Sequence, residues 1–240
     1  MKKRIWGLDA LRGLCILGMI AVHLIFDITQ LYPLIRWNYP AWFEKLMGLG
    51  GFAFVVISGI CVTLGSRSLR RGLIVFGCGM LCSLVTFLMA KAGPWSDSLI
   101  IYFGVLHCLG SCMLLWPLFK RLPHWALFLV GLGLAVLGIW FGTIYTNIPW
   151  LVVLGIRYPG FASSDYFPLP PSLGLFLMGA AMGKRYYRDK TTRLPRVNAQ
   201  APILRFLQFC GRHSLIIYLL HQPVLAGITT LIFLLTGGQL

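Results

Sequence analysis

Charged residues are scarce in this sequence: Asp, Glu, Lys and Arg make up 11% of its 240 residues, and only 6 of them are acidic. A soluble domain devotes roughly 25% of its residues to charged types. Hydrophobic residues reach 58%, and the mean hydropathy is +0.80. Long apolar runs between short polar ones predict an all-α transmembrane helix bundle, because lipid cannot satisfy open backbone groups. A soluble fold is therefore excluded.

The sequence also lacks the patterns of a cleaved leader and of a metal site. The first apolar run contains Arg12, His23 and Asp27 and has no small-residue cleavage site, so we expect it to stay as a membrane span. Two cysteine pairs with helical spacing have neither a CxxC motif nor a carboxylate beside them, and we interpret them as packing residues. No internal repeat is evident. We expect a single domain over residues 1–240 without a metal.

Seven apolar segments are long enough to cross a bilayer, which takes ~20 helical residues. They are residues 9–31, 44–65, 72–91, 98–119, 125–146, 168–184 and 212–236. Residues 202–210 are expected to form an amphipathic helix on the inner membrane face. Residues 147–171 form an apolar outer loop, which we expect to fold back as a lid or as a re-entrant turn.

The net charge of +15 is concentrated in alternate loops. Under the positive-inside rule these loops are cytoplasmic. The basic residues on that side are Lys2, Lys3, Arg4, Arg12, Arg67, Arg70, Arg71, Lys120, Arg121, Lys184, Arg185, Arg188, Lys190, Arg193, Arg196, Arg205 and Arg212. Only Arg36, Lys45, Lys91 and Arg157 fall outside. This distribution predicts a multi-pass plasma-membrane protein with its N-terminus inside and its C-terminus outside, and it accounts for the charge without nucleic acid.

The first span contains four ionisable residues on one side. Arg12 and His23 are eleven residues apart, so they lie on one helical stripe about 16 Å apart. Asp9 precedes Arg12 by three and Asp27 follows His23 by four, so each carboxylate is expected to reach its cationic neighbour. Such residues are costly in a membrane unless they face a polar cavity. The alternative is a salt-bridged helix end and a hydrogen-bonded core histidine.

Three later residues are further candidates. His107 opens the fourth span at a depth comparable to His23, which predicts a shared cavity; the alternative is a core histidine. His221 precedes Pro223, which is expected to kink the last span and free backbone groups. Asp165 lies just before the sixth span, either as a substrate-binding residue or as the N-terminal cap of that span.

Several arginines at inner helix ends allow two interpretations. Topology alone accounts for them. They could also form a mouth that binds the phosphates of an anionic donor, because guanidinium groups bind phosphate in a bidentate way. The arginines considered for this donor site are Arg12, Arg70, Arg121, Arg205 and Arg212.

Five sequence blocks occur in a familiar order. They are RIWGLDALRG with HLIFD, then FVVISGICVTL, IIYFGVLHCLG, SDYFPLPPSLGLFLMGAAMG and GRHSLIIYLLHQPVL. Together, over residues 4–227, they resemble the bacterial branch of the heparan-α-glucosaminide N-acetyltransferase-like family. The spacing of Arg12 and His23 is also similar to the arginine–histidine motif of acyltransferase family 3. One feature differs: the family's proposed catalytic histidine follows the first span, and this chain has no histidine between Leu24 and Leu106.

The resemblance implies a membrane acyltransferase. It would move an acetyl group from cytoplasmic acetyl-CoA to the amine or hydroxyl of an envelope sugar or glycolipid on the outer side. The alternatives are a transporter or flippase, which would also need buried polar residues, and a structural or sensory membrane protein without catalysis. A homo-oligomer is compatible with the sequence.

We assign expected roles within this hypothesis. His23 is the base that deprotonates the acceptor, Asp27 orients it, and His107 assists or stabilises the tetrahedral intermediate. Arg12 contacts the phosphates or pantetheine arm of the donor. The residues expected to face the acceptor are Asp165 and His221. A covalent acyl-histidine intermediate is left open.

Overall fold

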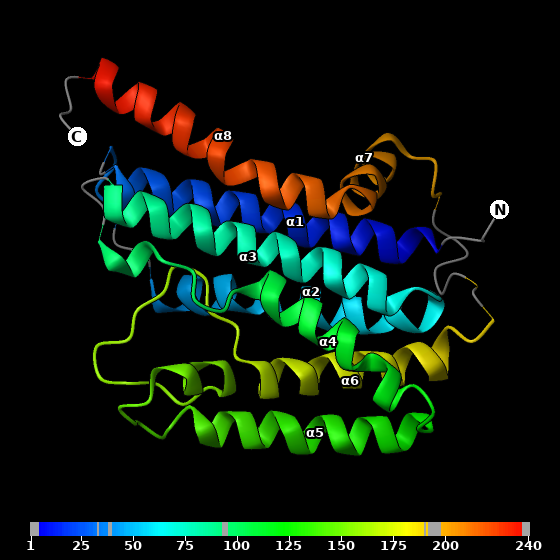
Figure 1. The fold of residues 1–240 in the computed structure, drawn as a ribbon. Coiled ribbons are helices and arrows are strands. Elements are labelled where there is room, and N and C mark those ends of the chain that lie inside the picture. The colour runs from blue at the N-terminus through cyan, green and yellow to red at the C-terminus, as the bar shows by residue number, and fades with distance from the viewer. Residues whose placement is uncertain are drawn as a thin grey trace. The chain divides into compact units, whose positions relative to one another are not determined.

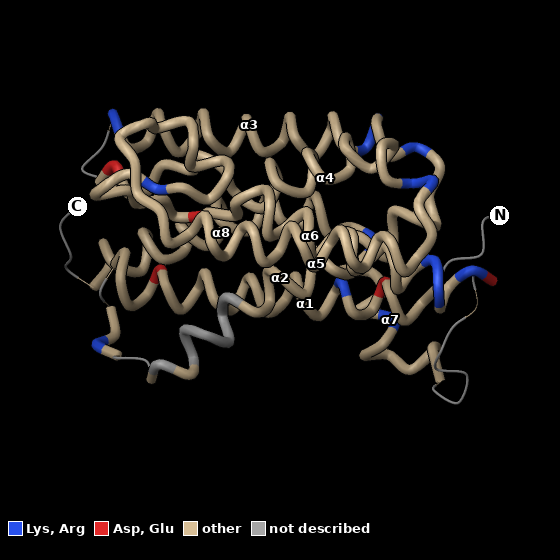
Figure 2. Tube along the Cα trace, turned by 90° about the horizontal axis from the view of Figure 1, so that it is seen from below, with Lys and Arg blue, Asp and Glu red and all other residues tan. Residues whose placement is uncertain are grey.

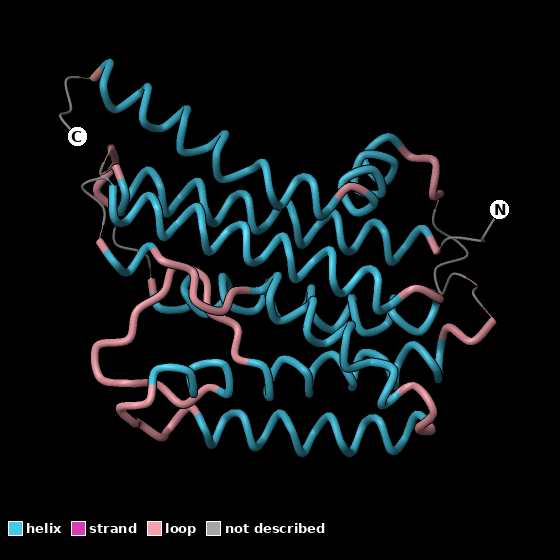
Figure 3. The backbone as a smooth tube through the Cα atoms, viewed as in Figure 1, coloured by secondary structure: helices cyan, strands magenta, loops and turns pink. Residues whose placement is uncertain are grey.

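The computed structural model describes residues 5–32, 34–37, 40–92, 96–189, 191 and 198–236, without the side chains at 41 and 43–48. Helices account for all the named elements in these residues, which confirms the all-α class (Figures 1 and 3). Contacts divide the chain into two compact units, each described by itself below. Unit 1 comprises Met1–Phe54 and Thr191–Leu240, and unit 2 comprises Val55–Lys190. The single domain over residues 1–240 stays a prediction.

Unit 1 is built from the two ends of the chain. Its helices are α1 (Trp6–Phe26), the π-helical turn η1 (Asp27–Leu31), the start of α2 (Ala41–Leu64), α7 (Pro202–Arg212) and α8 (Ser214–Leu235). The helix predicted at residues 202–210 is therefore confirmed as α7. Its large apolar residues Ile203, Phe206 and Phe209 are exposed, whereas Gln208 and Cys210 are buried. This division of the helix surface is the expected amphipathic one.

Glycines bring α7 directly onto α1. A side chain at Gly13 of α1 would overlap the carbonyl oxygen of Leu207, and one at Gly211 would overlap that of Asp9. The two backbones therefore touch at a point where only glycine fits, which is a common way for helices to approach closely in membranes. This crossing places the end of α7 beside the start of α1.

Contacts of α1, η1 and the following Tyr32 with α8 come in the same order along both segments. From the start of α1 onward, the contacting pairs are Arg12 with Ser214, His23 with His221, Asp27 with Gln222 and Tyr32 with Thr230. The two helices therefore run parallel. The predicted topology requires this relation, because the first and the last span both lead outward. The number of spans and the side on which each terminus lies stay predictions.

Unit 2 holds two closely packed helix pairs. Its elements after the second half of α2 are α3 (Ser68–Ala92), η2 (Asp97–Leu99), α4 (Val105–Phe119), α5 (His124–Phe141), η3 (Pro149–Leu154) and α6 (Leu169–Tyr186). The pairs are α3 with α4 and α5 with α6. Gly131 of α5 faces Gly174 of α6, and Gly138 faces Pro171, so these two helices are antiparallel and in close contact.

Four helices among the described residues are long and apolar enough to cross a membrane. They are Trp6–Leu31, Ser68–Ala92, His124–Phe141 and Ser214–Leu235. Shorter apolar helices cover Leu49–Leu64 and Val105–Phe119. Each of the seven predicted segments overlaps a helix, but the fourth begins at Val105 rather than at residue 98. The protein is thus an all-helical membrane protein with several apolar helices, and seven spans stay a prediction.

The topology can be tested with a reporter that is active only in the cytoplasm. We expect activity after fusion at Arg71, Arg121 or Lys190 and none after Leu240, because basic loops stay inside. Figure 2 shows most Lys and Arg positions near helix ends, where loops begin. Reporter activity at the C-terminus would require an even number of spans and would overturn the predicted topology.

Candidate active site

A polar cluster lies between the first and the last helix of unit 1. It consists of His23, Asp27, His221 and Gln222, and we call it the α1–α8 cluster. The rings of His23 and His221 meet edge to face, with centroids 4.9 Å apart and an interplanar angle of 77°. Asp27 is fully buried, and its carboxylate oxygens accept from Gln222 Nε2 at 3.0 and 3.2 Å. Three predicted site residues are thus brought together.

Gln222 also belongs to the cluster, although it was not among the predicted site residues. It lies on α8 between His221 and Pro223, and it reaches Asp27 across 195 positions of sequence. The available signal was its place beside a histidine and a proline in an apolar span, where an amide side chain is costly to bury.

The predicted contact between His23 and Asp27 is wrong. His23 Nδ1 donates to the carbonyl oxygen of Met19 at 2.9 Å, and no ion pair joins His23 to Asp27 in the described part of the chain. At Asp27 the helix widens into a π turn, in which the Tyr32 amide donates to the Asp27 carbonyl at 2.8 Å. Asp27 then pairs with Gln222 of α8 instead of with His23.

The hydrogen bonds of the two imidazoles define their tautomers. A carbonyl oxygen only accepts, so the proton of His23 lies on Nδ1, toward Met19, and its Nε2 holds a lone pair. His221 Nδ1 likewise donates to the Tyr218 carbonyl at 2.5 Å. In the neutral form both rings therefore carry their lone pair on Nε2, the nitrogen that would accept a proton.

Two acceptors in the cluster are buried without a partner. They are His221 Nε2 and Gln222 Oε1. Buried polar atoms are nearly always hydrogen-bonded in native proteins, to water or a ligand where the protein offers nothing. The cluster is thus suited to a molecule that brings hydroxyl or amine donors.

Arg12 makes a different contact from the expected one. Its Nη2 donates to Ser214 Oγ at 2.8 Å, its guanidinium lies 5.8 Å from the ring centre of Phe54, and its Nε is buried without a partner. The predicted pair of Asp9 with Arg12 is wrong, because the glycine crossing places Arg212 of α7 beside Asp9 instead.

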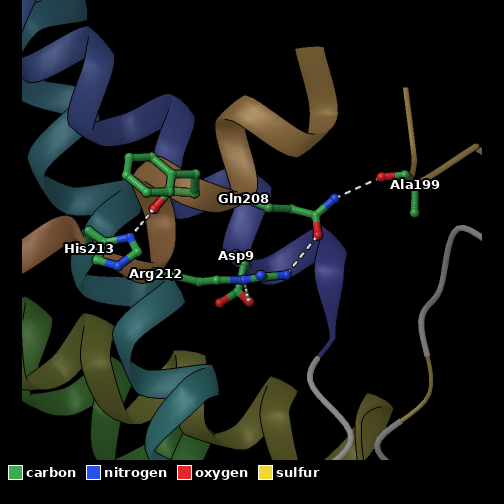
Figure 4. A network of polar contacts seen from close by, with 6 residues as sticks. Asp9, Ala199, Gln208, Arg212 and His213 are labelled. Carbon is green, nitrogen blue, oxygen red and sulfur yellow. Dashed lines mark hydrogen bonds and ion pairs between the residues drawn. The ribbon is translucent and has the colours of Figure 1, made fainter. Parts of the chain in front are cut away.

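Figure 4 shows the network that results around Arg212. Arg212 Nε is 3.4 Å from Asp9 Oδ2, and Arg212 Nη2 donates to Gln208 Oε1 at 3.0 Å. Gln208 Nε2 in turn donates to the Ala199 carbonyl at 2.9 Å. Arg212 is held in place at an exposed position, which suits a cation that has to meet an anionic ligand.

The other predicted donor-binding arginines are exposed. Arg205 lies on α7 in unit 1, whereas Arg70 and Arg121 belong to unit 2. A single phosphate-binding mouth formed by all of these arginines stays a prediction.

His107 is buried, and both of its ring nitrogens have partners within the protein. It is 2% exposed, its Nδ1 accepts from the Gly104 amide at 3.2 Å, and its Nε2 is 3.3 Å from Ser83 Oγ. Since the Ser83 hydroxyl already donates to the Ile101 carbonyl, His107 Nε2–H is the donor to Ser83. Both ring nitrogens are used, as in the core-histidine alternative. The catalytic role of His107 stays a prediction that these contacts do not support. The cavity that His107 is predicted to share with His23 of unit 1 also stays a prediction.

Asp165 caps a helix, but not the predicted one. Its Oδ2 accepts from the Val105 amide at 2.9 Å, so it closes the N-terminus of α4 rather than that of α6. The reason is that the loop folds back along the start of α4, where Ser163 Oγ donates to the Ile100 carbonyl and the Phe167 amide to the Phe103 carbonyl, both at 2.9 Å. Its role in binding substrate stays a prediction.

The same loop is fixed to η3 by a tyrosine. Tyr166 donates its hydroxyl to the Val152 carbonyl at 2.6 Å. Burial raises the pKa of Tyr166 to about 12, so the hydroxyl keeps its proton and remains a donor. The folded-back loop is the one expected at residues 147–171; its place as a lid or as a re-entrant turn in the membrane stays a prediction.

Comparison with known proteins gives one result. A family model described as "Heparan-alpha-glucosaminide N-acetyltransferase, catalytic" matches residues 4–223, which include the whole α1–α8 cluster. No curated protein and no solved structure matches the chain. Within the described residues no group of three or more His, Cys, Asp or Glu could hold a metal ion. The chain belongs to the heparan-α-glucosaminide N-acetyltransferase catalytic family and is a membrane protein of the acetyltransferase type.

Proposed function

We propose that this protein moves an acetyl group from cytoplasmic acetyl-CoA to the amine or hydroxyl of an envelope sugar or glycolipid outside the plasma membrane. Family membership supports the acetyl transfer. The observation that carries the proposal is the α1–α8 cluster, where two imidazole rings and an amide oxygen lie beside a buried carboxylate. His221 Nε2 and Gln222 Oε1 have no partner within the protein, so both are available to the hydrogens of an acceptor molecule.

The reaction needs only a base and a place for the acceptor. His23 Nε2 takes the proton of the acceptor N–H or O–H as that atom attacks the thioester carbonyl carbon. The C–S bond then breaks, and the CoA sulfur leaves with the proton held by His23. The negative charge of Asp27 stabilises the imidazolium between these steps. His221 Nε2 and Gln222 Oε1 bind further hydroxyl or amine hydrogens of the acceptor.

Arg12 fits the donor side of the reaction. It lies about 16 Å from His23 along α1, a distance that an extended pantetheine arm spans. Its buried Nε can donate to a carbonyl of the arm, while Arg212 and Arg205 are exposed nearby in unit 1 for the phosphates.

Loss of these cations should weaken donor binding. We expect Arg12→Gln and Arg212→Gln each to reduce CoA affinity by about 1.5–3 kcal/mol, the value of a hydrogen bond to a charged group. Arg36→Gln, an exposed arginine predicted on the outer side, is the matched control and should bind normally. Isothermal titration of purified protein with CoA measures the effect. Equal affinity in all variants, Arg70→Gln, Arg121→Gln and Arg205→Gln included, would assign these arginines to topology alone.

The function itself is tested with the purified protein in proteoliposomes. Acetyl-CoA labelled in the acetyl group is supplied on one side and amino sugars or lipid-linked sugars on the other. We expect label to leave CoA and to appear on the sugar. Movement of a labelled glycolipid across the membrane without any loss of acetyl label would instead support the flippase alternative.

A further inference from the structure

A groove of about 410 Å³ lies between the start of α5 and the end of α6 in unit 2. Its walls are formed by Trp125, Phe128 and Leu129 of α5 and by Met182 and Arg185 of α6. Ala181 lies at its floor and is 5% exposed. The volume falls within the ~300–1,000 Å³ of ligand sites.

The groove exists because the packing of α5 against α6 changes along the pair. At Gly131 and Gly138 the backbones touch, and no space is left. One to two turns closer to the start of α5 the glycines give way to Phe128 and Trp125, whereas the facing position on α6 is the small Ala181. The large side chains of α5 extend beyond this small alanine and form the walls of the groove.

Polarity changes from one end of the groove to the other. The antiparallel register of Gly138 with Pro171 places Phe128 level with Ala181, and His124 level with Arg185. The lining is therefore cationic or polar at the end where α5 begins and apolar along the remainder. Its apolar walls face outward, since Trp125 is 61% and Leu129 58% exposed.

Arg185 is available for an anion. Lys184, its neighbour, is engaged by the carbonyls of Lys120 and Leu122, at 2.7 and 2.6 Å from its Nζ. Arg185 lies 5.7 Å from the ring centre of Tyr186, and in the described part of the chain no carboxylate pairs with it.

We propose that this groove binds one anionic phospholipid, with the phosphate on Arg185 and His124 and an acyl chain along Phe128, Leu129 and Met182. The order of polarity along the groove is that of a lipid molecule. Both helices that line the groove are predicted membrane spans. The groove lies at their basic end, which is the predicted cytoplasmic end, and the inner leaflet presents anionic headgroups there. A CoA nucleotide fits less well, because its three phosphates would meet one guanidinium and one imidazole among apolar walls.

The proposal is tested by native mass spectrometry of the full-length protein released from detergent. The probes are phosphatidylglycerol and phosphatidylcholine with the same acyl chains. We expect phosphatidylglycerol to be retained more strongly, and Arg185→Gln to reduce its retention about tenfold or more, as loss of a charged hydrogen bond implies. Ala181→Phe should fill the groove and reduce the retention of both lipids. Arg188→Gln, an exposed cation close by that does not line the groove, is the matched control.

Three results would overturn the proposal. The first is equal retention of the two lipids by the unaltered protein. The second is the same loss in Arg188→Gln as in Arg185→Gln, which would indicate general charge attraction. The third is displacement of the lipid by CoA or by inorganic phosphate alone. Because the readout is lipid binding, it is independent of whether acetyl transfer is confirmed.

Discussion

Replacing His23 with alanine is expected to lower the rate of acetyl transfer about 10²–10⁴-fold, the usual contribution of a general base. The reason is that His23 Nε2 holds a free lone pair, while its Nδ1 proton is fixed by the Met19 carbonyl. CoA binding should remain normal, because Arg12 lies near the start of α1, far from His23, and Arg212 of α7 contacts Asp9 at that same end. The measurement is release of CoA from acetyl-CoA in the presence of the acceptor, together with titration of CoA.

His213→Ala is the matched control for this prediction. His213 is an exposed histidine of the same unit, whose Nδ1 also bonds to a backbone carbonyl, that of Phe209, at 2.9 Å. Its loss should leave the rate unchanged. If His23→Ala retains the normal rate and His221→Ala does not, the base is His221, whose Nδ1 likewise donates to a backbone carbonyl.

The second large effect is expected at the glycine crossing. Gly13→Ala should lower the free energy of unfolding by about 1–3 kcal/mol, the range observed for overpacking, because the new methyl group would overlap the Leu207 carbonyl. It should also disturb the pair of Asp9 with Arg212 that the crossing creates. Thermal unfolding in detergent measures the change.

Gly18→Ala gives the comparison on the same helix. Nothing lies within 4 Å of a side chain at Gly18, so only the helix propensity changes, by up to about 1 kcal/mol in favour of alanine. The two variants should therefore shift the unfolding temperature in opposite directions. Equal shifts would mean that α7 does not rest on α1 at Gly13.

The sequence predicted the helices well and the partners of the charged residues poorly. Spacing rules within one helix paired Asp9 with Arg12 and Asp27 with His23. In the structure Arg212 and Gln222 bind these two carboxylates instead. Partners about 200 positions away depend on how α7 and α8 pack on α1, and no local pattern contains that information.

The start of α4 was misplaced for a similar reason. Residues 98–104 are apolar enough to continue a span, so the sequence predicted a helix from residue 98. The helix begins at Val105 because the Asp165 carboxylate accepts from the Val105 amide and His107 Nδ1 accepts from the Gly104 amide. One of these two contacts crosses 60 positions of sequence, and this long-range contact cannot be predicted from composition.

The pairing of the first helix with the last has a consequence for how the protein is made. Asp27 and its partner Gln222 are 195 residues apart, so at a synthesis rate of about 5–20 residues per second the carboxylate waits roughly 10–40 s for its amide. A carboxylate costs about 2.5–3.5 kcal/mol at the centre of a membrane helix during insertion, and Asp27, at the C-terminal end of α1, has a smaller cost of the same sign. Arg12 likewise remains without its partner until Ser214, 202 positions later, has been synthesised. Nascent chains that stop before α8 therefore keep both polar groups without their native partners, and such chains are the ones that membrane quality control should remove first.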